Sequence, residues 1–270
     1  MIDGDKLICL VGGKDAGIVA FDKKTGTEIW RSVDAKEIGY ASPVIFESNG
    51  RRQLVVWHDV AVRGLDPATG KKLWNIPFPA ADKIQRPAVT IANPTLAGNR
   101  LFVSDFYNGS LMLDLAEDKA DAEELWSSPE DLGGHADTIN TLMAASVIRD
   151  GHIYGFAGDG EMRCLKVETG EVVWRDRKPA GGKKALFATI FIIPIGETGN
   201  RYFLYTDQGE LIIANLSPGG YEEVARAKVL DATSFARGRD VVWSHPAFAN
   251  RRMYARNDKE LACFDLSNGK

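Results

Sequence analysis

The chain has 270 residues, with 33 Lys and Arg against 37 Asp and Glu, and a formal net charge of −4 at neutral pH. This balance excludes the strongly basic surface that most nucleic-acid-binding proteins carry. With 44% hydrophobic and 26% charged residues, the composition is that of a folded globular protein and not of a disordered one. The 27 glycines favour many tight turns, and therefore many short strands.

The beginning of the chain has no basic segment followed by an apolar one, so no export signal is recognised in it. The longest nearly unbroken apolar run, residues 185–195, is far shorter than the ~20 residues that cross a bilayer. It predicts a buried strand and no membrane span. The three cysteines are odd in number and widely spaced, which argues against a disulfide framework and against a cysteine-based zinc site: Cys9, Cys164 and Cys263.

One pattern recurs along the chain. Residues 20–30 and 64–74 align position by position, residues 164–174 form a third copy, and a fourth starts at 263 and stops with the chain. Two copies are weaker: an acidic insertion separates Asp114 from Trp126, and the copy at 214–224 lacks the Trp. The aspartate slot falls at positions 22, 66, 114, 166, 215 and 265, in steps of 44 to 52 residues. A period near 50 is typical of the blade of a β-propeller.

Each copy is preceded by a short turn signal rich in Gly or Asn and then an apolar segment, as at Asp3-Gly4, Asn49-Gly50 and Gly98-Asn99. Such pairs predict hairpins. The second repeat predicts four strands, at 42–46, 53–57, 61–65 and 72–76. The whole chain, residues 1–270, is therefore predicted to be one all-β domain, a propeller of four-stranded antiparallel blades. The approximate repeats are 1–36, 37–80, 81–130, 131–180, 181–230 and 231–270.

The repeated motif has a structural explanation at each position. Its Asp and Thr can accept hydrogen bonds from local backbone N–H groups, and its Gly supplies the positive φ of a hairpin between the third and fourth strands. Its Trp then falls on the fourth strand, where the ring can pack against the neighbouring blade. The residues predicted to have these structural roles are Asp22, Gly26, Trp30, Asp66, Gly70, Trp74, Trp126, Gly170, Trp174 and Asp265.

The repeated Asp-x-x-Thr-Gly-x-x-x-Trp resembles the repeat of the pyrroloquinoline-quinone (PQQ) dehydrogenase-like propellers. The segments 17–30, 40–74 and 243–266 are most similar to the BamB-like and uncharacterised exported bacterial members of that superfamily. The resemblance covers the whole chain and implies a propeller fold, with a periplasmic or extracellular location. It leaves the function open, because the superfamily contains both enzymes and non-catalytic proteins.

The two ends of the chain predict incomplete repeats. The first repeat starts at its second strand, and the last repeat ends after its third. Since members of the superfamily usually close at seven or eight blades, we expect the six visible repeats to be part of such a propeller, lacking roughly two blades. The alternative is that six sheets close on one another, two of them with three strands.

A quinoprotein alcohol or sugar dehydrogenase is the alternative function that the resemblance implies. It would need PQQ and calcium, cations for the cofactor, a Trp beneath its rings and acidic calcium ligands; the alcohol dehydrogenases also have two adjacent cysteines. No adjacent pair exists here, and Cys164 and Cys263 fill a slot that Ala20 and Gly64 fill in other repeats. We therefore expect no cofactor and no metal, and no catalytic residue is assigned.

Residues that the repeat does not require are better candidates for binding. In propellers, the segments joining one blade's fourth strand to the next blade's first strand lie on one face, where ligands usually bind. The segment 133–140 combines an imidazole, a carboxylate and an amide on a glycine-containing loop. The candidate binding residues on this face are Tyr40, Arg86, His135, Asp137, Asn140, Arg239 and His245.

An acidic residue also follows the second strand of every repeat, at positions 15, 59, 105, 159, 207 and 258. The six could form a ring for a cation, but a residue that recurs in every blade is better explained as a turn cap. The leading hypothesis is a non-catalytic binding or scaffolding module for a protein, peptide or glycan, without nucleic acid. A hydrolase or lyase using His135 and Asp137 has only that loop in its favour.

Overall fold

The computed structural model describes residues 1–48, 50–58, 60–79, 90–128 and 137–267. Within these residues the chain is almost entirely β, with a single 3-10 helix, η1 (Lys178–Ala180). The strands form six antiparallel sheets that follow one another along the chain, and one two-stranded hairpin. This confirms the predicted all-β propeller built from sequential blades. No helix in the described part is long and apolar enough to cross a membrane.

Strand order follows chain order in every sheet. The first sheet contains β1 (Ile2–Asp3), β2 (Lys6–Leu10), β3 (Ile18–Asp22) and β4 (Glu28–Ser32). The second contains β5 (Val44–Ser48), β6 (Arg51–His58), β7 (Ala61–Leu65) and β8 (Lys72–Pro77). The third contains β9 (Thr95–Ala97), β10 (Arg100–Asp105), β11 (Gly109–Leu115) and β12 (Ala122–Ser127). The fourth contains β13 (Val147–Arg149), β14 (His152–Ala157), β15 (Glu161–Lys166) and β16 (Val172–Asp176).

The fifth sheet contains β17 (Ile190–Pro194), β18 (Arg201–Thr206), β19 (Glu210–Ser217) and β20 (Gly220–Lys228). The hairpin of β21 (Ser234–Ala236) and β22 (Arg239–Val241) follows it. The sixth sheet contains β23 (Ala247–Ala249), β24 (Arg252–Arg256) and β25 (Leu261–Asp265). The described residues thus give this last sheet three strands.

The first sheet differs from the prediction, which gave it no inner strand. Ile2 pairs with Leu7 and Asp3 with Lys6, so β1 completes a four-stranded blade. The pairing is possible because Gly4 adopts a φ of 57° and closes a tight turn between β1 and β2. A two-residue strand has no hydrophobic alternation of its own, and the sequence pattern therefore missed it.

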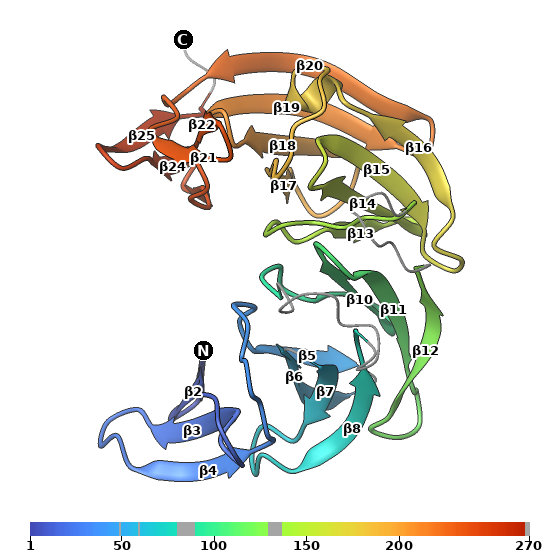
Figure 1. Ribbon diagram of the computed structural model, residues 1–270, viewed down its shortest axis with the longest axis vertical. Helices are drawn as coiled ribbons and strands as arrows, with labels where there is room; N and C mark the ends of the chain where they lie inside the picture. Colours follow the sequence, from blue (N-terminus) through green and yellow to red (C-terminus); the bar gives the residue numbers. More distant parts are fainter. Residues whose placement is uncertain (49, 59, 80–89, 129–136, 268–270) are drawn as a thin grey trace.

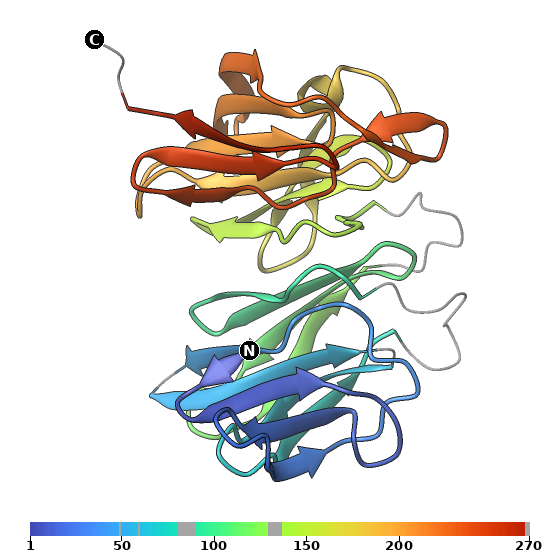
Figure 2. The same ribbon diagram turned by 90° about the vertical axis from the view of Figure 1, so that its left-hand side faces the viewer.

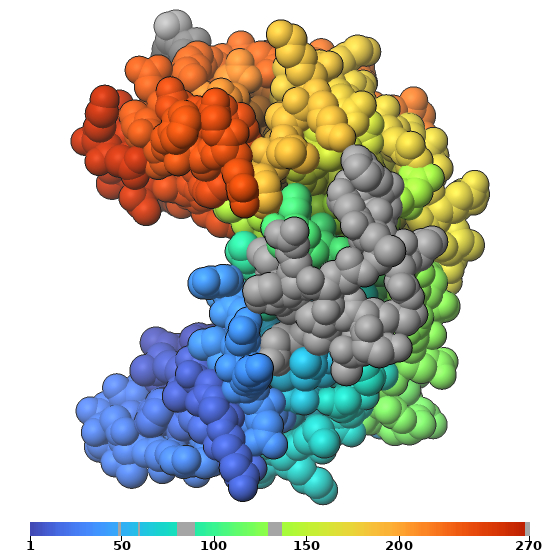
Figure 3. All heavy atoms as spheres, viewed as in Figure 1, coloured from blue at the N-terminus to red at the C-terminus, as the bar shows by residue number. Residues whose placement is uncertain are grey.

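The sheets are arranged around a common axis as an arc, with the first sheet at one end and the sixth at the other (Figure 1). The ends do not meet, and an open sector separates them in the space-filling view (Figure 3). The segment between β4 and β5, η1 and the β21–β22 hairpin all lie on one side of the arc, at the right in Figure 2. We call this side the connector face.

The core is divided among the junctions between neighbouring sheets. At the first junction, Ile8, Ala20 and Trp30 of the first sheet pack with Leu54 and Leu65 of the second in one hydrophobic cluster. Four further clusters of the same kind join the remaining neighbours. Full burial of one large aliphatic side chain stabilises a fold by about 1.5–3 kcal/mol. These interblade faces therefore hold the arc together.

The repeated motif forms the turn between the third and fourth strands. The Oδ1 atom of Asp22 accepts hydrogen bonds from the backbone N–H groups of Lys24 and Thr25, at 2.9 and 2.7 Å. These bonds lower the pKa of Asp22, that from Thr25 having the largest effect. Gly26 completes the turn with a φ of 73°, and Gly70 adopts 72° in the second sheet. The motif thus recurs because each blade needs the same turn.

The motif tryptophans pack against the turn of the next blade. A Cβ added to Gly70 would lie 2.5 Å from the ring of Trp30, and one added to Gly170 would lie 2.8 Å from the ring of Trp126. The ring of Trp74 instead donates to Gln53 Oε1 within its own sheet, at 2.6 Å. The blade that follows Trp74 carries the acidic insertion in place of the Thr-Gly turn, so no equivalent glycine is there to receive the ring.

Candidate binding site on the connector face

The connector face is built by segments that the repeat does not specify. They are residues 33–43 before the second sheet, residues 177–189 before the fifth, and the β21–β22 hairpin before the sixth. Segments of this kind can change without disturbing the blades, and they are where binding residues usually lie. The contacts of each segment decide which side chains are used by the fold and which face solvent.

A buried ionic network fixes the segment that leaves the fourth sheet. Arg163 Nη2 lies 3.3 Å from Asp159 Oδ2 and 2.8 Å from Glu161 Oε2. Arg177 Nη2 lies 3.1 and 2.9 Å from the same two carboxylates, and Arg163 also donates to the carbonyl oxygen of Thr138. Two cations and two anions compensate one another, as buried charges require. The network therefore positions connectors and is not an open binding site.

Arg239 is used in the same way. Its Nη2 donates to Asp207 Oδ2 at 2.6 Å and to the carbonyl oxygen of Phe187 at 3.2 Å. The same Asp207 oxygen accepts a hydrogen bond from Thr189 N at 3.0 Å. Arg239 thus ties the hairpin to the fifth sheet and to the preceding connector. These contacts give Arg239 an anchoring role, and its predicted role in partner binding stays a prediction.

Two of the six carboxylates that follow the second strands accept local backbone hydrogen bonds in the described residues. Asp105 Oδ1 accepts from the N–H groups of Tyr107 and Asn108 at 2.8 and 2.9 Å, and Asp159 Oδ1 from that of Glu161 at 3.2 Å. These contacts are those of turn caps. In the part of the chain that the structure describes, no group of three or more His, Cys, Asp or Glu is placed to hold a metal ion.

The other predicted residues are dispersed. The Tyr40 side chain is 78% exposed, while its backbone N–H donates to Thr90 O at 2.8 Å and fixes the loop. Asp137 forms an ion pair with Arg175. Asn140 is buried, and its carbonyl oxygen accepts from Gly158 N at 3.0 Å, so it supports the fold.

His245 packs its ring against Phe191, with 4.0 Å between the ring centroids. Desolvation there lowers the pKa of His245 and favours the neutral imidazole. Arg86 and His135 lie outside the described residues. Of the seven predicted residues, Tyr40 is therefore the one on the described surface whose side chain is both well exposed and without a contact that the fold uses.

Sequence reasoning missed an aromatic stack at the centre of the connector face. The rings of Phe106 and Phe187 are stacked, with centroids 4.7 Å apart and planes inclined by 18°. The guanidinium carbon of Arg237 lies 4.7 Å from the centroid of Phe187 on the hairpin side. Gly158 leaves room for this stack, since a Cβ there would lie 2.1 Å from the Phe106 ring. Three segments far apart in sequence meet at this point.

Exposed apolar and basic side chains lie on the two segments that carry Phe187 and Arg237. Leu186 is 57% exposed and Phe235 is 75% exposed. Lys183, Lys184 and Arg237 are exposed beside them. We call these five residues the connector patch. The sequence could not predict the exposure of these residues, because they do not recur with the repeat. A single Phe or Leu in a connector is equally compatible with a buried and with an exposed position.

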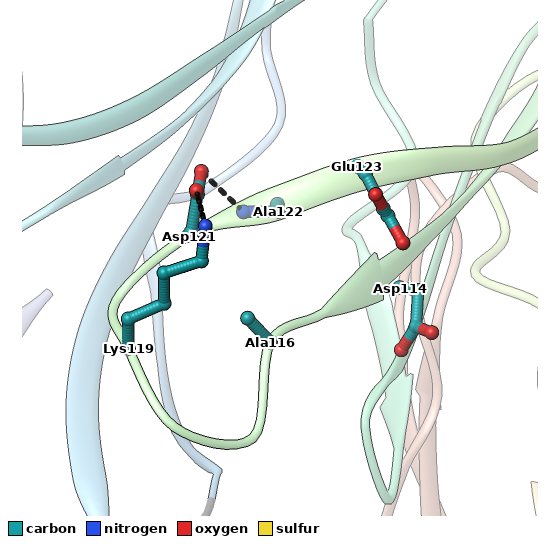
Figure 4. A pocket seen from close by; sticks show the side chains of 6 residues that line it. All are labelled: Asp114, Ala116, Lys119, Asp121, Ala122 and Glu123. Carbon is teal, nitrogen blue, oxygen red and sulfur yellow. Dashed lines mark hydrogen bonds and ion pairs between the residues drawn. The ribbon is translucent and has the colours of Figure 1, made fainter.

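A shallow hollow of about 150 Å³ lies elsewhere, at the acidic insertion between β11 and β12 (Figure 4). Lys119 Nζ lies 2.7 Å from Asp121 Oδ2 on its rim. The connectors leave β12 at its C-terminal end, so this hollow beside its N-terminal end belongs to the opposite side of the arc. The residues lining it are Asp114, Ala116, Lys119, Asp121, Ala122 and Glu123.

Comparison with known proteins fixes the family. A family model described as outer membrane protein assembly factor BamB matches residues 1–139 and again residues 118–270. The chain belongs to the BamB family of PQQ-repeat propellers. The resemblance that the motif indicated is thereby confirmed. Among curated protein sequences, none matches this BamB-family chain.

Solved structures agree with the fold at low sequence identity. BamB from Moraxella catarrhalis superposes with a TM-score of 0.67 at 16% identity, covering 100% of this chain and 70% of that one. The computationally designed Ika8 protein gives 0.59 at 14%, covering 100% and 71%. Quinohemoprotein alcohol dehydrogenase from Comamonas testosteroni gives 0.56 at 12%, covering 93% and 50%. The fold of this BamB-family chain is thus similar to that of an alcohol dehydrogenase as well as to that of BamB.

The cofactor that the enzymatic relatives would imply needs a flat aromatic ring as a platform, and four of the six tryptophans can be assigned to other contacts. Trp30 and Trp126 are used at interblade contacts, and the Nε1 of Trp174 donates to Ser217 O of the next sheet at 2.8 Å. Trp57 is 1% exposed and packs beside Phe78. None of these rings is presented as a platform for a planar cofactor.

Proposed function

We propose that this BamB-family propeller is a non-catalytic binding or scaffolding module that receives a protein partner on its connector face. The observation that carries the proposal is the connector patch, where Leu186 and Phe235 expose apolar surface on segments that also carry three exposed cations. Protein interfaces are rich in aromatic and arginine side chains at their centres. The stacking of Arg237 on Phe187 holds its guanidinium in place before binding, which reduces the entropy lost on association.

The positive charge of the connector patch indicates the charge expected of its partner. Lys183, Lys184 and Arg237 favour an acidic segment that carries apolar side chains for Leu186 and Phe235. The family description names an outer membrane protein assembly factor, and we extend that context to this chain. We therefore expect the protein to be exported, to work in the periplasm and to bind a protein of the cell envelope.

Affinity capture from an envelope extract tests the proposal. The immobilised chain is compared with the double variant Leu186→Asp/Phe235→Asp, and with the double variant Ile29→Asp/Val224→Asp as a matched control. Ile29 on β4 and Val224 on β20 are each 48% exposed and lie outside the connector patch, so the control adds the same two charges elsewhere. We expect one protein to be captured by the parent chain and by the control, and to be lost at least tenfold with the patch variant.

Two further conditions sharpen the test. Capture by the parent chain should weaken as salt is raised, because exposed charges are screened. Digestion of the extract with protease should abolish capture of a protein or peptide but leave capture of a glycan intact. If the parent chain, the patch variant and the control variant all retained the same proteins equally, the connector patch would not be the binding site.

A further inference from the structure

The loop of residues 181–186 follows η1 directly. Its first residue, Gly181, adopts a φ of 83° and donates its N–H to Lys178 O at 3.0 Å. Near its other end, Ala185 N donates to Asp159 O at 3.1 Å. The first four residues of the loop are exposed, so its course depends on how firmly η1 is held. The loop carries three of the five residues of the connector patch: Lys183, Lys184 and Leu186.

Arg226 on β20 holds η1 at its carbonyl oxygens. Its Nη2 donates to Lys178 O at 3.2 Å, and its Nη1 donates to Pro179 O at 3.5 Å. Few donors satisfy the carbonyl oxygens at the end of a helical turn, and basic side chains are suited to bind them. Arg226 thus joins the connector that enters the fifth sheet to the last strand of that same sheet.

Two carboxylates fix the guanidinium of Arg226. Its Nη1 lies 2.6 Å from Glu210 Oε2 on β19. Its Nε and Nη2 donate to the two carboxylate oxygens of Glu223, at 3.1 and 2.9 Å. With the two carbonyl oxygens, these contacts use the five N–H donors of an arginine. A lysine has the same charge but no planar fork, and it could not make this set of bonds.

Other sheets hold their connectors by the same kind of contact. Arg63 on β7 donates from Nη1 to Asp34 O, in the connector that enters the second sheet, at 3.1 Å. Arg163 on β15 donates to Thr138 O, in the segment that enters the fourth sheet. In each case an arginine of the sheet binds a carbonyl oxygen of the connector that precedes it. Arg226 differs from these two because its connector carries part of the connector patch.

We propose that Arg226 is a positioning residue of the connector patch, which holds the loop of residues 181–186 in the conformation that the protein partner binds. This inference rests on the proposed function, since the partner is the one assigned to the connector patch. A loop that is ordered before association loses less conformational entropy on binding. If only about one molecule in ten kept the competent loop conformation without Arg226, the apparent affinity would fall about tenfold.

Three single variants test the role of Arg226. Arg226→Gln removes the charge and most of the contacts, Arg226→Lys keeps the charge without the fork, and Arg63→Gln is the matched control that loosens a different connector. Amide hydrogen exchange followed by mass spectrometry reports on the loop of residues 181–186. Affinity capture from the envelope extract reports on binding, and urea denaturation gives the global stability of each variant.

We expect both Arg226 variants to exchange the amides of the loop at least about fivefold faster than the parent chain, and to capture the partner about tenfold less well. Arg63→Gln should match the parent chain in both measurements, even where it lowers the free energy of unfolding as much as Arg226→Gln does. A purely structural role of Arg226 would make the two glutamine variants alike.

The outcomes separate this inference from the proposed function. Unchanged exchange of the loop in Arg226→Gln would overturn the inference, and so would full capture by that variant while Leu186→Asp/Phe235→Asp captures nothing. Full capture by Arg226→Lys would assign the effect to charge alone and would also overturn it. If the parent chain captures no protein that the patch variant loses, the proposed function is wrong and the role in binding falls with it. The exchange rates then still decide whether Arg226 holds the loop.

Discussion

At the residue scale, the tryptophan of the repeat packs against the blade that follows its own. Trp30 is 8% exposed and its ring lies over Gly70, where an added Cβ would come within 2.5 Å of the ring. The nitrogen of this ring has no hydrogen-bond partner within the described residues, so its contribution comes from packing. One residue therefore couples two repeats.

We expect Trp30→Ala to lower the free energy of unfolding by about 3–5 kcal/mol, since a large buried ring is replaced by a cavity between two sheets. Urea denaturation followed by fluorescence or circular dichroism measures the loss. Ile29→Ala is the control, because Ile29 is 48% exposed and its truncation should cost less than about 1 kcal/mol. Equal losses in the two variants would contradict the role assigned to the ring.

Cys164 and Cys263 have the same place in the repeat but different surroundings. Burial raises the pKa of Cys164 to about 12, so at pH 8 roughly one thiol in ten thousand is the reactive thiolate. We expect alkylation at pH 8 to modify the exposed Cys263 within minutes and Cys164 only when the protein unfolds. Peptide mapping after timed quenching gives both rates, and rapid modification of Cys164 in folded protein would contradict the packing of the fourth junction.

At the scale of elements, the β21–β22 hairpin carries two nearby arginines that make different contacts. Arg239 is tied to Asp207 and Phe187 O, whereas Arg237 lies exposed over the face of Phe187. The first arginine holds the hairpin on the fifth sheet. The second is available to a partner.

We expect Arg239→Ala to increase trypsin cleavage in the hairpin severalfold, because hydrogen bonds to charged groups are worth about 1.5–3 kcal/mol and the Asp207 carboxylate loses its cation. Arg237→Ala should leave cleavage at Arg239, the one trypsin site that it leaves in the hairpin, nearly unchanged but weaken partner capture. Limited proteolysis with mass spectrometry separates the two effects. If the Arg237→Ala variant were the more easily cleaved of the two, the stacking of Arg237 on Phe187 and not the ion pair of Arg239 would hold the hairpin in place.

At the scale of the whole molecule, six blades in an open arc share a fold with both an assembly factor and a dehydrogenase. Trp30 and Trp126 pack between sheets, Asp105 caps a turn, and Asp159 pairs with Arg177. We therefore expect calorimetric titration with PQQ in the presence of calcium to give no saturable heat. A quinoprotein dehydrogenase serves as the positive control. Saturable, calcium-dependent binding at one site would favour the enzymatic alternative.

The repeat made the fold predictable. Its aspartate, glycine and tryptophan recur because every blade needs the same capped turn and the same interblade contact, and this regularity is visible in the sequence. The two-residue strand β1 and the β21–β22 hairpin escaped, since neither is long enough to show an alternation. The connector patch was not predicted either, because the connectors do not repeat. Without a repeat, the sequence does not indicate which of their side chains are buried and which are exposed.

The amino-acid sequence by itself determined the blade, its period and the family, because each depends on contacts between residues close together or one repeat apart. Only the tertiary structure decided that Arg239 is tied to Asp207, that Phe106, Phe187 and Arg237 meet in one stack, and that Leu186 and Phe235 are exposed. The residues brought together lie from 32 positions apart, for Arg239 and Asp207, to 131 positions apart, for Phe106 and Arg237. Which of these side chains are buried is therefore a property of the folded arc and not of any local pattern.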